Sequence, residues 1–370
     1  MTGRETEYIR QAVEGGKISG NGEFTHRCQD YFERRYGFRK CLLTTSCTDA
    51  LEMAAILTGV GPGDEVIVPS YTFVSSALAF VRQGATIVFA DSRADQPNVD
   101  EAGLEALVTP RTRVIVPVHY AGVACDMDAI MSVARRHDLL VVEDAAQAID
   151  SCYKGRPLGS IGHLAAFSFH ETKNIIAGEG GMLVVNDERF IRRAEIIWEK
   201  GTNRAEFFRG EVNKYGWVDT GSSFLPTEVV SAFLWAQLEH LDEIQAERRR
   251  LWERYREFFS HAPCAAELGL PVVPDYATNN AHMFYLLFPD LAKRTDFIAK
   301  MKARDVLTVF HYLPLHSSEF YLKYVKTHPT EIPNLPNCDR YADTLVRLPL
   351  YCGLGSDQDK VLTAIKESLA

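Results

Sequence analysis

The chain has 370 residues, of which 46% are hydrophobic and 24% are charged, so it is long enough for a large core and for two domains. Its formal net charge of -9 at pH 7 gives no basic surface that would favour nucleic acid or an anionic membrane. No apolar stretch approaches the roughly 20 residues that span a bilayer, and the N-terminus lacks the apolar core of a signal peptide. We therefore expect a cytoplasmic protein without nucleic-acid or membrane partners.

The eight cysteines are scattered along the chain. They form no C-x-x-C pair, and they do not cluster with histidines at the spacing of metal ligands. We expect reduced thiols and no metal.

From about residue 40 to residue 190, short apolar runs alternate with helical patterns, which is typical of a mostly parallel α/β sheet. A helix is expected between successive strands, the first over 48–58. The strands are predicted at residues 40–45, 65–69, 85–90, 114–118 and 139–143.

After residue 226 the pattern changes, and one long helix is predicted over residues 228–260. It would link a large domain, residues 1–245, to a small C-terminal α+β domain, residues 246–370. The small domain is predicted to hold strands at 283–288 and 306–310 and helices around 294–303 and 357–368.

Polar and aromatic residues stand where the predicted strands end. These groups are Ser46-Cys47-Thr48, Tyr71-Thr72-Phe73, His119-Tyr120 and Asp144. Ligands of such sheets collect at the carboxyl ends of the strands, so the groups are expected to share one site.

An apolar strand that ends in Asp144, followed about thirty residues later by Lys173 before a glycine-rich turn, suits a pyridoxal phosphate (PLP) site. An aspartate facing the pyridine nitrogen favours the protonated, electron-accepting ring. A lysine can form a Schiff base with the cofactor aldehyde if burial leaves its amine neutral. In this interpretation Gln147 bonds the ring hydroxyl, and Ser168 donates to the phosphate. Each residue alone also has an ordinary explanation, as a strand-end carboxylate or a surface lysine.

The segment Ser46-Cys47-Thr48 opens a helix with small and hydroxyl residues, whose free N–H groups suit a phosphate. The same pattern is that of a plain helix N-cap, and the residues alone allow both. Phe73 can stack on a flat cofactor ring or pack in a core.

Several long motifs, in the same order, resemble the DegT/DnrJ/EryC1/StrS family of sugar-nucleotide aminotransferases, which have PLP fold type I, like aspartate aminotransferase. The likeness extends from about residue 18 to residue 368. The motifs are Ser46–Leu51, Pro69–Val74, Val118–Cys125, Phe167–Asn174, Glu199–Arg204 and Phe310–His316.

The resemblance implies roles for individual residues. Lys173 matches the Schiff-base lysine, Asp144 the pyridinium partner, Gln147 the residue beside the ring hydroxyl and Phe73 the stacking aromatic. Cys47, Thr48 and Ser168 match phosphate-binding positions, and His311, Tyr312 and His316 belong to the segment that approaches the sugar. Arg204 is a candidate for a diphosphate or for the carboxylate of the amino donor, and surface placement fits it equally well.

The family forms homodimers in which the second subunit completes each cofactor site, often with an asparagine. Ser223 occupies the place of that asparagine here, and its shorter side chain leaves its role open.

The resemblance predicts transfer of the amino group of L-glutamate to a keto sugar nucleotide. It is strongest to members that convert dTDP-4-keto-6-deoxy-D-glucose to dTDP-4-amino-4,6-dideoxy-D-galactose in dTDP-sugar biosynthesis, a route that in some cases supplies lipopolysaccharide. A C3-keto sugar, a UDP or GDP sugar and a non-catalytic regulator that binds PLP or sugar are the alternatives. Lys173 argues against a PLP-dependent dehydratase, which has histidine there. The missing G-x-G-x-x-G turn argues against a nucleotide-dependent oxidoreductase.

Overall fold

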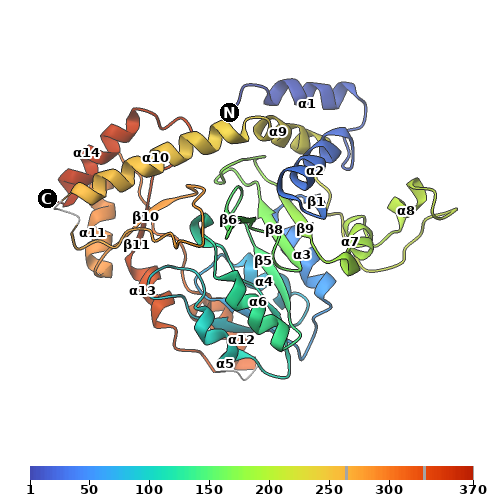
Figure 1. Ribbon diagram of the computed structural model, residues 1–370, viewed down its shortest axis with the longest axis horizontal. Helices are drawn as coiled ribbons and strands as arrows, with labels where there is room; N and C mark the ends of the chain where they lie inside the picture. The colour runs from blue at the N-terminus through green and yellow to red at the C-terminus, as the bar shows by residue number, and fades with distance from the viewer. Residues whose placement is uncertain (263–265, 328–330, 370) are drawn as a thin grey trace.

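A computed structural model describes residues 1–262, 266–327 and 331–369, so Cys264 lies outside the described residues. Its centre is a seven-stranded sheet with the strand order β1-β9-β8-β5-β4-β2-β3 (Figure 1). The strands are β1 (Lys40–Thr44), β2 (Glu65–Pro69), β3 (Thr86–Ala90), β4 (Thr112–Ile115), β5 (Leu140–Asp144), β8 (Leu164–Ser168) and β9 (Gly181–Val185). All five strands predicted before residue 150 are confirmed, with ends shifted by up to three residues.

Only β9 runs against its neighbours: it pairs antiparallel with both β1 and β8, and the other pairs are parallel. The prediction of a mostly parallel sheet is therefore confirmed. The carboxyl ends of parallel strands lie at the same edge of a sheet, and the ends of β2, β5 and β8 lie at this edge.

Helices cover both faces of this sheet because successive strand residues point to opposite sides. Val66 and Val68 join one core cluster with α3, whereas Ile67 joins a second cluster with α2 and α6. The helices before residue 240 are α1 (Glu5–Glu14), α2 (Glu23–Tyr36), α3 (Cys47–Thr58), α4 (Ser75–Val81), α5 (Leu104–Leu107), α6 (Met127–Arg136), α7 (Ile191–Trp198), α8 (Arg204–Phe208) and α9 (Glu228–Leu238).

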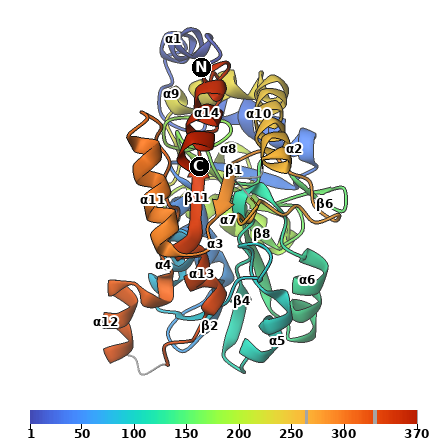
Figure 2. The ribbon, with the colours of Figure 1, turned by 90° about the vertical axis from the view of Figure 1, so that its left-hand side faces the viewer.

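The C-terminal part has a core of its own, in which aromatic residues of α10 pack on a two-stranded sheet and on the last helix. The long helix α10 runs from the neighbourhood of α9 to α14 (Figure 1). Figure 2 views the molecule from the side where α11, α14 and β11 lie in front. The elements are α10 (Leu241–His261), β10 (Phe284–Leu287), α11 (Leu291–Lys302), α12 (Glu319–Thr327), α13 (Pro336–Thr344), β11 (Leu345–Leu348) and α14 (Asp357–Leu369), and a separate two-stranded ribbon consists of β6 (Cys152–Tyr153) and β7 (Arg156–Pro157).

Two predicted elements are wrong. The helix expected over 228–260 is broken between α9 and α10, where Glu239 bonds Arg4 and Tyr8 and α1 packs along α9. No proline or glycine marks this break, because tertiary contacts cause it.

The strand expected over 306–310 is replaced by irregular chain with a single bridge, from Val309 to Arg347. The partner of β10 is instead β11, with Tyr285 opposite Arg347. The domain boundary at residues 245 and 246 stays a prediction. No described helix is both long and apolar enough to cross a bilayer.

Candidate active site

A cavity of about 660 Å³ opens at the carboxyl edge of the sheet. Its walls come from the ends of β5 and β8, the first turn of α3, the loop before α4 and three segments of the C-terminal part. Among the lining residues are nine that the sequence predicted: Cys47, Thr48, Phe73, Asp144, Gln147, Ser168, Lys173, His311 and Tyr312. The ends of three predicted strands thus meet at one site, as the sequence predicted. Tyr71, His119 and Tyr120, which that prediction included, do not line the cavity. His119 is fully buried, with Nε2 2.9 Å from Glu143.

Asp144 ends β5 and lies almost fully buried in the cavity wall. Its Oδ2 accepts a hydrogen bond of 2.6 Å from the Ser76 hydroxyl, and its Oδ1 accepts one of 3.1 Å from the Ala146 N–H. These two donors fix the orientation of the carboxylate.

Lys173 lies in the loop between β8 and β9, and its backbone N–H bonds the His170 carbonyl at 2.9 Å. Within the described residues its amine has no hydrogen bond and no ion pair. Burial lowers the pKa of this amine, and the charge of Arg347 lowers it further, against the opposing effects of Cys47 and Asp144. A lysine of this kind is available to react with a carbonyl.

The first turn of α3 faces the cavity, and Ser46 caps it by accepting a 3.1 Å bond from the Asp49 N–H. Gly181 of β9 lies against this turn so closely that a Cβ there would be 2.4 Å from the Cys47 nitrogen. The Thr48 and Ser75 hydroxyls lie 2.7 Å apart. Backbone N–H groups and hydroxyls at a helix N-terminus form a ready anion site.

Aromatic and amide side chains form the opposite wall. Phe73 is 56% exposed at the cavity and its ring centroid lies 6.2 Å from that of Tyr312. The Gln147 amide donates to the Tyr312 hydroxyl at 3.0 Å and accepts from the Ala121 N–H at 2.7 Å. The Tyr120 hydroxyl lies 2.7 Å from His311 Nδ1. Burial and the charges of Arg347 and Lys173 hold the pKa of His311 well below its ordinary range, so its ring is neutral.

Arg347 of β11 also lines the cavity, and sequence reasoning missed it. Its Nε is buried without a hydrogen-bond acceptor, and its guanidinium has no carboxylate partner in the part of the chain that the structure describes. The sequence signal that could have found it is a charged residue inside the apolar run 345–350, because a charge within a buried strand usually has a function. His282, Ser75, Ser76 and Glu179 were missed as well.

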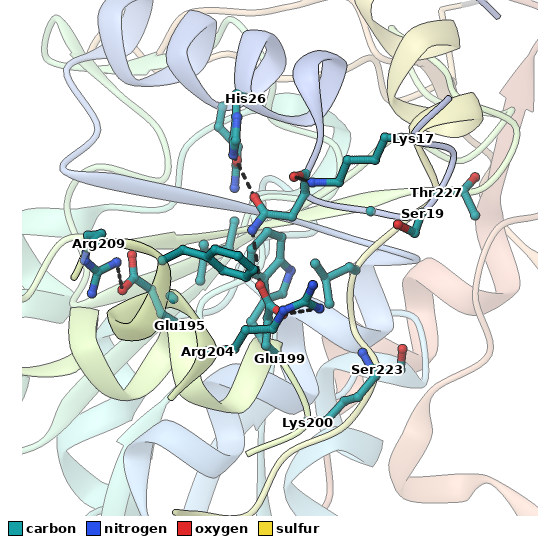
Figure 3. A pocket seen from close by; sticks show the side chains of 18 of the residues that line it. Lys17, Ser19, His26, Glu195, Glu199, Lys200, Arg204, Arg209, Ser223 and Thr227 are labelled. Atoms are coloured by element: carbon teal, nitrogen blue, oxygen red, sulfur yellow. Dashed lines mark hydrogen bonds and ion pairs between the residues drawn. The ribbon is translucent and has the colours of Figure 1, made fainter. Parts of the chain in front are cut away.

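Three predicted residues lie elsewhere. His316 is buried, with Nδ1 2.8 Å from the Ser70 hydroxyl. Arg204 and Ser223 line a second cavity of about 640 Å³ between α2, β1, α7 and α8, shown in Figure 3. There Arg204 lies 3.5 Å from Glu199. Within one chain, neither Arg204 nor Ser223 is among the residues that line the Lys173 cavity.

The residues present fit PLP. The cavity has an unpartnered lysine amine, an oriented carboxylate, an anion-binding helix N-terminus and an exposed aromatic ring on one wall. These are the groups that the aldehyde, ring nitrogen, phosphate and flat ring of that cofactor require.

Comparisons with known proteins agree with this geometry. Residues 1–366 match the sequence model of the DegT/DnrJ/EryC1/StrS aminotransferase family. The chain is 35% identical to the spore coat polysaccharide biosynthesis protein SpsC of Bacillus subtilis, over 98% of this chain and 94% of that protein. It is 34% identical to GDP-perosamine synthase of Caulobacter vibrioides, over 100% and 96%. Among solved structures, Spr1654 from Streptococcus pneumoniae in its PLP-form superposes with a TM-score of 0.90 at 25% identity, over 100% and 96%.

Proposed function

The chain belongs to the DegT/DnrJ/EryC1/StrS aminotransferase family, whose cofactor is PLP, and on that premise we propose that it moves the amino group of L-glutamate to a keto sugar nucleotide. The observation that carries the proposal is that one cavity holds a lysine amine and an arginine side chain, neither of which has an ion-pair partner among the described residues. The lysine suits proton transfer, and the arginine suits the carboxylate of an amino acid.

When bound, PLP supplies an aldehyde carbon that takes up the amino group and a ring that stabilises negative charge on the neighbouring carbon. The residues of the chain perform the remaining tasks. Asp144 would face the ring nitrogen, and the first turn of α3 would bind the phosphate. Lys173 would take the proton from the Cα of the amino donor and deliver it to the carbon that was the aldehyde carbon of the cofactor.

Arg347 is the proposed partner of the α-carboxylate of L-glutamate. Its planar fork matches a carboxylate with two parallel hydrogen bonds. The backbone N–H of Arg347 bonds the carbonyl of Val309, two residues before His311, at 2.8 Å. This bridge places Arg347 on the wall of the cavity that His311 and Tyr312 also form.

His311 and Tyr312 are proposed to hydrogen-bond the hexose, because both are uncharged groups at the cavity wall. We propose dTDP-4-keto-6-deoxy-D-glucose as the acceptor and dTDP-4-amino-4,6-dideoxy-D-galactose as the product, on the motif likeness alone. Similarity to a GDP-perosamine synthase supports a GDP-linked sugar as the second candidate.

The test is NMR analysis of the product formed by purified protein with L-glutamate, PLP and either keto sugar nucleotide. An axial amine on C4 of the dTDP sugar would support the first candidate, and turnover of the GDP sugar alone would support the second. No 2-oxoglutarate from L-glutamate would refute the transaminase.

We also propose a homodimer with shared sites. Arg204 and Ser223 match family positions at the substrate and cofactor, yet in a single chain they line the second cavity. The α8 segment projects away from the sheet (Figure 1) and carries the exposed rings of Phe208 and Trp217. Co-expression of the Lys173→Ala and Arg204→Ala variants tests whether two subunits share each site. A mixed dimer would then contain one intact active site and would regain activity. No recovery in purified mixed dimers would contradict it.

A further inference from the structure

His282 lines the Lys173 cavity but has no role in the function proposed above. It lies just before β10 and is only 6% exposed. Its backbone is fixed on both sides: its N–H donates to the Asn280 side chain at 3.0 Å, and its carbonyl accepts from Arg248 at 2.7 Å. The backbone of His282 is therefore held in place from both sides.

The protonation of the ring follows from Asn174, the residue after Lys173. Asn174 approaches the backbone carbonyl of Asn280 at 2.9 Å, and a carbonyl can only accept, so the Asn174 atom there is its amide nitrogen. The same nitrogen donates to Gln245 at 2.8 Å. The Asn174 oxygen thus faces His282 Nδ1 at 2.8 Å, and Nδ1 must carry the proton.

A neutral ring with a proton on Nδ1 has a lone pair on Nε2. Within the described residues Nε2 has no hydrogen-bond partner, and it is not among the fully buried orphan atoms. The ring cannot readily gain a second proton. Burial holds the pKa of His282 well below its ordinary range, and the charges of Lys173, Arg248, Arg347 and His311 act in the same direction.

Lys173 is the donor that this lone pair matches. Its amine lines the same cavity and has no partner in the part of the chain that the structure describes. Lys173 also directly precedes Asn174, the residue that orients His282. We propose that His282 is a positioning residue. A rotation of the Lys173 side chain within the cavity would bring its amine to Nε2, which would accept a hydrogen bond from it. The bond would hold the amine near the cofactor carbon that receives the proton of the donor Cα. The purpose assigned to this contact rests on the proposed transamination, but the contact itself is tested without it.

The first experiment uses the cofactor-free protein. The rate at which an acylating reagent modifies Lys173 is measured against pH by peptide mass spectrometry. An acceptor stabilises the ammonium form, so His282→Leu should shift the midpoint down by about one pH unit. His282→Gln keeps an acceptor oxygen and should bring the midpoint most of the way back to the wild-type value. His137→Leu, directly after α6 and outside the cavity lining, should leave the midpoint unchanged. An unchanged midpoint in His282→Leu would overturn the proposal.

The wild-type protein gives a second test that does not depend on folding of a variant. Nitrogen-15 NMR of the imidazole should show a neutral ring with the proton on Nδ1 from pH 6 to pH 9. A proton on Nε2, or a charged ring in that range, would overturn the proposal.

With cofactor present, His282→Leu should lower kcat of the glutamate half-reaction about tenfold, because one oriented hydrogen bond is lost. KM for L-glutamate should stay unchanged. A raised KM with unchanged kcat would mean that Nε2 contacts the substrate instead, and would overturn the positioning role. If the wild type performs no transamination, the labelling and NMR tests still decide the contact.

Discussion

Replacing Arg347 with methionine tests the donor side of the site. Methionine has a similar length and fills the same inward position on β11, but it cannot bond a carboxylate. The Arg347 side chain has no carboxylate partner among the described residues, so its removal breaks no ion pair of the fold. We expect folded protein that binds L-glutamate poorly.

The size of the effect follows from the number of hydrogen bonds. A fork of two charge-assisted bonds to a carboxylate, each at about 1.5 kcal/mol, contributes about 3 kcal/mol. At about 1.4 kcal/mol for each factor of ten, kcat/KM for L-glutamate should fall about 150-fold. Arg347→Lys keeps the charge and one bond, so its loss should be about tenfold.

The assay separates the two halves of the reaction by following the cofactor absorbance in single turnovers. The glutamate half should slow as above, while the half-reaction of the aminated cofactor form with the keto sugar nucleotide should change less than about twofold. An equal loss in both halves would refute the carboxylate role and would point to the sugar diphosphate instead.

Three further outcomes are expected. Asp144→Asn should keep the cofactor but slow turnover by more than about tenfold, since an amide does not hold the ring nitrogen protonated; unchanged single-turnover rates would contradict this. Lys173→Met should abolish turnover and raise the thermal stability of the cofactor-free protein at pH 7. The pKa of Lys173 is lowered in the folded state, so burying its ammonium group lowers the free energy of unfolding. This loss of stability is full below the lowered pKa and disappears above 10.5. A stability gain in Lys173→Met that does not shrink toward high pH would count against a buried charge. Gly181→Ala would place a Cβ 2.3 Å from the Ser46 carbonyl carbon, and by moving the first turn of α3 it should lower kcat/KM about a hundredfold. Gly180→Ala, whose Cβ would come no closer than 3.3 Å to another atom, should be tolerated. Equal kcat/KM values for the two variants would refute this prediction.

Much of the large domain was readable because its signals are local. Apolar runs such as 65–69 and 139–143 are buried on both faces, and a strand of that kind needs little help from the rest of the chain to be recognised. The ends of those strands then predicted where Asp144 and Phe73 would meet. The break between α9 and α10 had no such signal, since its cause is a contact with α1 more than 200 residues away.

The sequence by itself determined the chemistry of the site: a lysine, an aspartate and a capped helix, each recognisable from its own neighbours. Only the tertiary structure decided which side chains share the cavity. It brought Arg347 and His282 from the C-terminal part to Lys173, and it left Arg204 and Ser223 in another cavity. The reason is physical: periodicity and capping depend on residues a few positions apart, whereas burial, charge pairing and proton position depend on groups that meet only when the sheet and the C-terminal core have packed together.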